Sequence, residues 1–345
     1  MIYGLRECML DGTSRRKFLA GTAAATIVGA AGCLGDDDVE TINLAVPPSG
    51  TVSNRGVSAL QRAVSQESDS IDLRIEETSG DPESIREFDA GGVGAHTSGL
   101  SIMMRARDGR EPFEDDTPES FADQVFNYAA LHHYFVAVEG SGLETFDDIV
   151  EQADDLGIYI LPPGWGLRRL AEDVLQEMGV FDEIQPSVVD LETSEVAGAV
   201  EEGRIDALLV YGANFVNNPG WVQEVDARND VFAVEATDTW TSGLEASAAT
   251  NPIEMEPYGW DQDVGLDEVV AYPESFSVYA GDSISSDGIY ELCRVSHEHI
   301  DVVHEADESY LDHSDVNQMT AGLSGDLPYH EGAEQFYEEY GADMP

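Results

Sequence analysis

A strand, a helix and a second strand follow one another early in the chain, and this order limits the folds that it can adopt. Residues 41–46 (TINLAV) are predicted to form the first strand, and a polar loop follows at 47–55. From about Gly56, apolar residues recur at the spacing of one buried helix face: Val57, Leu60 and Val64. A second strand is indicated by alternation of Ile71, Leu73 and Ile75. Because parallel strands are joined by crossover helices, this order predicts a parallel α/β sheet.

The same alternation continues along the chain and predicts a second α/β lobe. Further strands are expected at 134–138, 157–161, 205–211, 269–272 and 275–280. Helices are expected after Thr145, after the glycine loop at 162–166, from Thr193, and as one long helix over Ile289 to Val303. The segment 238–269 is rich in Thr, Pro and Gly and has little periodicity, so we expect it to wrap between the lobes. A length of 345 residues fits two such lobes.

The charge of the chain is extreme, because 16 Lys+Arg stand against 69 Asp+Glu and give a formal net charge of -53. The only lysine is Lys17, and residues 33–345 carry 67 acids against 12 arginines, a charge of -55. Such repulsion weakens a compact fold unless salt shortens the Debye length, which is about 3 Å at 1 M. Dispersed acids therefore predict a surface adapted to concentrated salt, with docking of a cationic partner as the alternative. Nucleic acid is excluded as a partner, because phosphate binding needs a basic face.

Residues 1–32 have the features of an export signal. Arg15 and Arg16 precede an apolar run of about 15 residues, which is too short for a membrane-spanning helix. This arrangement resembles the twin-arginine signal, which implies export of a folded protein. Residues 30–33 (AAGC) resemble a lipobox, in which Cys33 would be lipidated, and an acidic tether follows at 33–40. We therefore expect an extracytoplasmic, cell-surface protein anchored to the cytoplasmic membrane through Cys33; a start at Met1 or at Met9 stays open.

Cysteine and histidine usage predicts neither a disulfide nor a metal site in the mature chain. Cys8 precedes the signal and Cys33 would be acylated, which leaves Cys293 alone on an apolar helical stripe as a packed thiol. His297 and His299 would lie about 200° apart around a helix and cannot share one ligand face. No cofactor is expected.

Four short motifs together resemble one known family. They are residues 49–51 (SGT) with Gly56, residues 163–166 (PGWG), residues 202–207 (EGRIDA), and residues 327–333 (LPYHEGA) with Tyr337 and Gly341. In this order they resemble the TAXI family, the substrate-binding subunits of one class of tripartite ATP-independent periplasmic (TRAP) transporters. The resemblance spans about residues 41–341, and within its C-terminal motif His330 is expected to fix a turn.

The resemblance implies a type II periplasmic-binding fold, in which two α/β lobes close on a ligand by a hinge motion. Lobe 1 would comprise 41–136, lobe 2 would comprise 137–245, and a crossover at 246–345 would return to lobe 1. The implied function is capture of a small organic solute, with carboxylates and amino acids as candidates, for the membrane subunits of a TRAP-type importer driven by an ion gradient. The alternative is a binding lipoprotein of an ATP-driven (ABC) importer of the thiamine-precursor or sulfonate-binding kind. A surface enzyme is the third class, but no nucleophile elbow or Ser-His-Asp spacing supports it, so we predict no enzymatic activity.

The resemblance also implies where a small-molecule ligand would lie, because in such folds ligands bind beyond the carboxyl ends of strands and at helix N-termini. The candidate ligand-binding residues are Ser49, Gly50, Thr51, Ser53, Thr78, Ser79, Gly164, Trp165, Gly166, Arg168, Tyr211, Asn214 and Tyr258. Some have structural alternatives, with Thr51 as a helix cap, Trp165 packed within its own lobe, and Arg168 facing solvent. The loops depart from the family pattern at 52–54, at Trp165, and at Asp81, which replaces a serine. We therefore expect a conserved scaffold with a different ligand chemistry.

Overall fold

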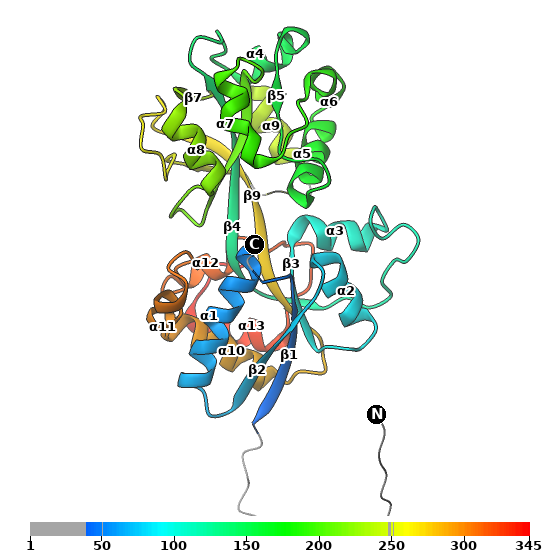
Figure 1. The fold of residues 1–345 in the computed structure, drawn as a ribbon. Coiled ribbons are helices and arrows are strands. Elements are labelled where there is room, and N and C mark those ends of the chain that lie inside the picture. The colour runs from blue at the N-terminus through cyan, green and yellow to red at the C-terminus, as the bar shows by residue number, and fades with distance from the viewer. Residues whose placement is uncertain (1–38, 50, 248–249, 251) are drawn as a thin grey trace, which may run out of the picture. The chain divides into compact units, whose positions relative to one another are not determined.

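The computed structural model describes residues 39–345 except Gly50, residues 248–249 and Asn251 (Figure 1). The predicted export signal and the lipid-attachment residue Cys33 lie outside the described residues. A nine-stranded sheet runs through the described chain in the order β2-β1-β3-β9-β4-β6-β5, with β7 paired to β4 and β8 paired to β9. Helices cover this sheet in two lobes, which confirms the predicted mixed α/β fold.

Lobe 1 begins with the predicted strand-helix-strand unit. β1 (Glu40–Val46) pairs in parallel with β2 (Ile71–Glu77) and β3 (Ala95–Gly99), which confirms the parallel sheet. The helices that follow these strands are α1 (Val52–Glu67), α2 (Asp81–Asp89) and α3 (Leu100–Asp108). The expected start of α1 near Gly56 is wrong. The helix begins at Val52, because Oγ1 of Thr51 accepts the N–H of Asn54 and caps the first turn.

Two long antiparallel strands, β4 (Asp123–Val138) and β9 (Val269–Ala280), connect the lobes. In Figure 1 they run from the lower lobe into the upper one. The sequence predicted only the far end of β4, and it predicted two strands where β9 is continuous. Pro273 and Glu274 interrupt the apolar pattern of β9, but they keep their place in the ladder opposite His132 and Leu131.

Lobe 2 packs its helices around the other half of the sheet. Its strands are β5 (Ile158–Tyr159), β6 (Ala207–Ala213) and β7 (Val231–Ala233). Its helices are α4 (Phe146–Glu151), α5 (Gly166–Glu177), α6 (Phe181–Ile184), α7 (Thr193–Glu201), α8 (Gly220–Arg228) and α9 (Asp238–Ala246), with 3-10 turns at Ala153–Asp155 and Gln185–Ser187. The expectation that 238–269 wraps between the lobes is wrong for its first part, because α9 buries Trp240 and Leu244 in the lobe 2 core. β8 (Ile253–Met255) then leads into β9.

The C-terminal part of the chain returns to lobe 1. It contains α10 (Ser286–Glu298), α11 (Ile300–Ala306), α12 (Val316–Thr320) and α13 (Glu331–Tyr340). The single helix expected over Ile289 to Val303 is broken at His299, whose backbone leaves the helical region. Cys293 is fully buried, and burial raises the pKa of its thiol, as expected for a packed residue. His330 accepts the N–H of Gly332 at 3.2 Å and caps α13, so it does fix a turn.

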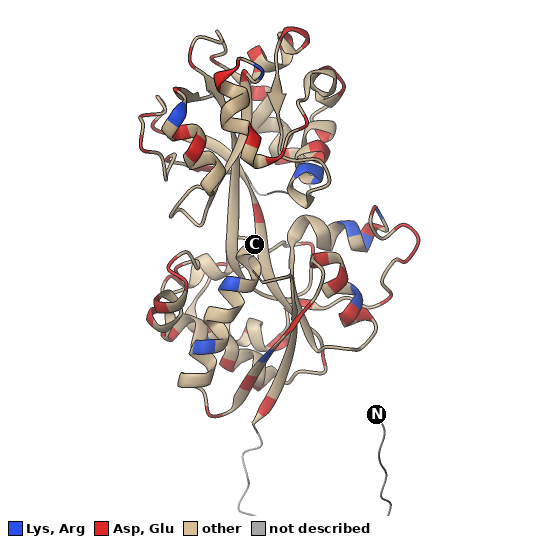
Figure 2. Cartoon of the chain, viewed as in Figure 1, with Lys and Arg blue, Asp and Glu red and all other residues tan. Residues whose placement is uncertain are grey.

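Each lobe has its own hydrophobic core. Leu44, Leu60 and Ile289 are buried in lobe 1, and Val174 and Leu208 are buried in lobe 2. Acidic residues are spread over both lobes with few basic ones between them (Figure 2). Among the described residues, no helix is long and apolar enough to cross a membrane, and no group of His, Cys, Asp or Glu side chains is arranged to hold a metal ion.

Candidate ligand-binding site

The two predicted ligand loops of lobe 1 lie side by side at the carboxyl ends of β1 and β2. The N–H of Thr78, just past β2, donates to the carbonyl of Val46 at the end of β1 at 2.9 Å. Both loops lead directly into the N-termini of helices α1 and α2. The two loops are therefore neighbours, and their role in binding a ligand stays a prediction.

The individual side chains of these loops have different environments. The hydroxyl of Thr51 caps α1 and also donates to the carbonyl of Pro48 at 2.9 Å. The hydroxyl of Thr78 lies 2.8 Å from that of Ser84 and holds the turn into α2. Ser49 and Ser79 are exposed, whereas Ser53 is buried, and Gly50 lies outside the described residues. Thr51 and Thr78 thus have local structural roles.

The predicted loop of lobe 2 places Trp165 at the N-terminal cap of α5, where 37% of its surface is exposed. Gly164 before it has a φ of +87°, a backbone conformation that favours glycine, and a Cβ at Gly166 would meet nothing within 4 Å. Arg168 does not face solvent, because it donates to the carbonyl of Leu161 at 2.9 Å. It also forms ion pairs with Glu172 at 2.7 Å and Asp190 at 3.2 Å. Its guanidinium is therefore engaged within lobe 2.

Asn214 and Tyr258 lie beside the connecting strands. Oδ1 of Asn214 accepts the N–H of Ala130 in β4 at 2.6 Å, which ties the end of β6 to β4. The Tyr258 hydroxyl lies 2.8 Å from Nδ1 of His132, and burial lowers the pKa of this histidine to about 4. His132 in turn lines a cavity of about 280 Å³ together with Asn127, Phe215, Ser275, Gln318 and Gly322. Tyr211, in β6, packs its ring against those of His133 and Trp221.

Two carboxyl groups that were not among the candidates meet at Gly99, where β3 ends and α3 begins. The N–H of Gly99 donates to Oδ2 of Asp81 at 3.3 Å. The Glu274 carboxyl occupies the place where a Cβ on residue 99 would lie, so a side chain there would have to displace it. Oε1 of Glu274 accepts from the Ser101 hydroxyl at 2.8 Å. Since both groups contact the same residue, their bonded oxygens lie within about 8 Å of each other.

Several polar atoms around this point have no hydrogen-bond partner, although they are buried. They are Oδ1 of Asp81, Oε2 of Glu274, and the hydroxyls of Thr97, Ser98, Tyr128 and Ser277. Ser98 and Ser277 lie directly opposite each other in the β3–β9 ladder. Buried polar groups in native proteins are nearly always paired, so an unpaired cluster requires an explanation.

Burial dominates the electrostatics of both carboxyl groups. It raises the pKa of Glu274 to about 8, with a further increase from the negative charge of Asp81 and a decrease from the Ser101 hydroxyl. It raises the pKa of Asp81 to about 6, against the lowering effect of the Gly99 N–H. Burial also raises the pKa of Tyr128, whose hydroxyl lies near those of Ser53 and Thr97, so Ser53 belongs to the same neighbourhood.

Sequence signals for this cluster were weak. Asp81 stood out as a departure from the family's loop pattern, but Glu274 fell between the two strands predicted at 269–272 and 275–280. Gly99 carried no signal by itself. The three residues come from distant parts of the chain, so no local spacing relates them.

The lobes also contact each other through charged side chains close to this cluster. Arg105 of α3 forms an ion pair with Asp173 of α5, and Arg110 lies 3.9 Å from the same carboxylate. Arg169 of α5 pairs with Glu111 at 2.8 Å. These pairs connect α3 of lobe 1 to α5 of lobe 2, so the region beside Gly99 lies where the two lobes meet.

Comparisons with known proteins give one family and several distant structures. No curated protein sequence matches the chain at a significant level. MatC from Rhodopseudomonas palustris, solved with bound malate, is similar at 14% identity, with 88% of this chain and 97% of that chain covered and a TM-score of 0.46. The aliphatic sulphonate binding protein SsuA from Escherichia coli is similar at 12% identity, with 87% and 93% covered and a TM-score of 0.42. Likenesses at this level are too distant to assign a function.

A sequence-family match is more informative, because it extends over most of the chain. The model that matches is described as the NMT1-like family, and the match covers residues 51–341. It begins at the cap of α1 and ends at Gly341, just past α13, so it includes both lobes and both connecting strands. This chain therefore belongs to the NMT1-like family.

Proposed function

We propose that this chain is an extracytoplasmic solute-binding lipoprotein that captures a small organic solute for a TRAP-type importer driven by an ion gradient. Membership in the NMT1-like family and the two-lobed α/β architecture support a binding protein. The TAXI resemblance of the loop motifs supports the TRAP type. The function requires no chemical reaction at the site.

The observation that carries the proposal is the cluster of buried, unpartnered polar groups beside the strands that join the lobes. Glu274, whose Oε2 has no partner, belongs to β9. Asp81, whose Oδ1 has no partner, is the first residue of α2. A polar solute between the lobes would supply the missing hydrogen bonds, and this gain would offset part of the cost of burying these groups. Two cores joined by two strands can also change their relative orientation by a hinge motion.

Ligand capture can be followed through Trp165, which is exposed at the start of α5. If the lobes close on a ligand, Trp165 becomes less exposed and its fluorescence changes. Protein purified in high salt should retain a small molecule that mass spectrometry identifies, and adding it back to stripped protein should shift the fluorescence. The shift should disappear in Trp165→Phe but persist in Trp260→Phe. A protein that retains no solute, and whose fluorescence no solute changes, would contradict a binding function.

The transporter type and the anchor need separate tests. Genes for TRAP membrane subunits next to this gene would support the ion-gradient importer, whereas an adjacent ATPase gene would favour the ABC alternative. Cys33→Ser should release the protein from membranes into the medium, because the residue would carry the lipid. Unchanged membrane retention of this variant would exclude Cys33 as the anchor.

A further inference from the structure

The two oxygens of each carboxyl group, in Asp81 and in Glu274, have different environments, and this difference indicates what kind of ligand can bind. In each carboxyl group one oxygen accepts a hydrogen bond, from the Gly99 N–H or the Ser101 hydroxyl. The second oxygen of each group is buried and unpartnered. Only 2% of the Glu274 surface is exposed, and no other carboxylate among the described residues is buried to this degree. Both free oxygens can only accept hydrogen bonds when the carboxyls are ionised.

Among the described residues, no cation forms an ion pair with either group. The charge of Arg105 lowers the pKa of Glu274, but its guanidinium is bonded to Asp173 and to the carbonyl of Glu111. Arg110 also lies beside Asp173. None of the ion pairs among the described residues includes Asp81 or Glu274. The charges of Glu274 and Asp81 in turn help to raise the pKa of Tyr128, Tyr272 and Tyr279, whose phenols are neutral.

We propose that the solute carries a positively charged ammonium or guanidinium group, and that the free oxygens of Asp81 and Glu274 bind this group at Gly99. The proposal rests on the proposed function and specifies the chemical class of its ligand. An ammonium group provides three N–H donors, which match acceptor oxygens that have no other donor. Gly99 is part of the site, because a side chain there would displace the Glu274 carboxyl.

An anionic ligand fits this arrangement less well. A carboxylate at the same point would lie beside two acids and would need a proton on Glu274 to form a hydrogen bond, with like-charge repulsion from Asp81. A cation instead favours the ionised form of both groups. Cation binding therefore transfers the proton of Glu274 to the buffer, whereas anion binding retains it.

The two modes make opposite predictions for pH dependence. Because the pKa of free Glu274 is raised to about 8, a cation must displace a proton at lower pH. Its affinity should then rise with pH by up to about tenfold per unit until about pH 8, and level off above it. Calorimetry in phosphate and in HEPES buffer should show one proton released per ligand near pH 7. An anion that requires protonated Glu274 would bind more weakly as pH rises.

The experiment uses the mature chain in about 2 M salt, so that surface repulsion is screened. Thermal shift and calorimetry compare putrescine, ethanolamine, alanine, glycerol and succinate, which span cations, a zwitterion, a neutral solute and a dianion. We expect the solutes with an ammonium group to bind and succinate and glycerol not to bind. Glu274→Gln and Asp81→Asn should each weaken ammonium binding on the order of 100-fold, the scale of losing one partner of a buried charge pair.

Glu151→Gln is the matched control, because Glu151 is an exposed acid at the end of α4 in lobe 2, away from the described cavity. It removes the same charge and should leave the affinity unchanged. Unfolding midpoints of all three variants report whether the fold is retained. Binding of succinate with affinity that falls as pH rises, or undiminished ammonium binding by Glu274→Gln, would overturn the cation proposal while the binding function stands. If no solute of any charge binds, the proposed function fails as well.

Discussion

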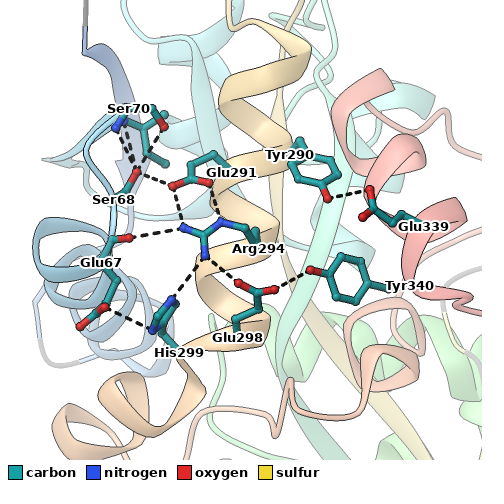
Figure 3. A network of polar contacts seen from close by, with 11 residues as sticks. Glu67, Ser68, Ser70, Tyr290, Glu291, Arg294, Glu298, His299, Glu339 and Tyr340 are labelled. Atoms are coloured by element: carbon teal, nitrogen blue, oxygen red, sulfur yellow. Dashed lines mark hydrogen bonds and ion pairs between the residues drawn. The ribbon is translucent and has the colours of Figure 1, made fainter. Parts of the chain in front are cut away.

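Two groups of acidic residues in lobe 1 have opposite environments, one with a basic partner and one without. Around α10, Arg294 is shared by several acceptors (Figure 3): Glu291 and Glu298 each lie 2.7 Å from it, and the carbonyl of Glu67 accepts from it as well. Tyr340 donates to Glu298 at 2.6 Å in the same network. The pKa of Glu291 is lowered, first by Arg294, and the pKa of Glu298 is lowered by Tyr340 and then by Arg294. These acids are therefore held ionised.

The acidic residues around Gly99 have the opposite environment. Asp81 and Glu274 have no basic partner, and burial raises the pKa of both. In a chain with so few arginines, each cation placed on the surface is unavailable elsewhere. The acid content of a region therefore does not by itself identify a binding site in this chain. The informative acids are those that the protein buries and leaves unpaired, because their cost must be offset by something outside the chain.

Salt should affect the two groups of acids differently, and its effect on the stability of the protein is the largest that we expect. The repulsion of a mature chain with a net charge of -55 is screened as salt increases, so the unfolding midpoint should rise by roughly 10 °C or more between about 0.1 and 2 M KCl. The effect of Glu274→Gln on stability should change little over this range, because a buried group is poorly screened. Calorimetric scans of both proteins measure this, and a flat salt profile of the unaltered protein would contradict adaptation to salt.

Rising pH should reveal the cost of the buried pair. The folded state holds a proton on Glu274 up to about pH 8, whereas the unfolded chain releases it near the usual glutamate pKa of 4.5. The folded pKa is thus the higher one, so the stability that this group contributes is present below pH 4.5 and is lost as pH rises towards 8. Glu274→Gln removes the ionisable group and therefore removes this loss of stability. Its stability relative to the unaltered protein should increase between pH 5 and 8 by a few kcal/mol, at about 1.4 kcal/mol per pKa unit.

Chemical denaturation at constant salt measures this difference. Glu151→Gln is again the control, because an exposed carboxylate should give a difference that does not change with pH. A constant difference for Glu274→Gln as well would mean that Glu274 is hydrated or paired in solution.

Local patterns predicted the fold wherever one element carries its own signal. The alternation of Ile71, Leu73 and Ile75 and the cap at Thr145 identified β2 and α4 correctly. Most of β4 was missed because it is buried along nearly its whole length and so does not alternate. β9 was divided into two strands because Pro273 and Glu274 interrupt its apolar pattern. α9 was missed because its two buried residues, Trp240 and Leu244, are too few to form a stripe.

The candidate site was less predictable for a different physical reason. The sequence correctly indicated the strand ends that lead into α1, α2 and α5, because loops and helix starts are local. It could not relate Asp81, Gly99 and Glu274, which meet only after β9 returns from lobe 2 and pairs with β3. Arg168 was also a candidate, as a scarce arginine with a bidentate guanidinium, but Leu161, Glu172 and Asp190 bind that guanidinium. The ligand role of the remaining candidates stays a prediction.

The smallest expected effect concerns Arg294, and it tests the other side of the comparison. Arg294→Met removes the shared cation but keeps most of the aliphatic length, so Glu291 and Glu298 lose their partner. Partly exposed ion pairs contribute about 0.2–1 kcal/mol each, so we expect a loss of about 1–2 kcal/mol in unfolding free energy at about 1 M salt, which diminishes at higher salt. The control is Arg204→Met, because Arg204 pairs with Glu202 through side chains that are 48% and 66% exposed. This control should change stability by less than about 0.5 kcal/mol. Equal losses in the two variants, measured by denaturant titration, would mean that the Arg294 network is no more than a set of surface pairs, and the contrast with Gly99 would then rest on burial alone.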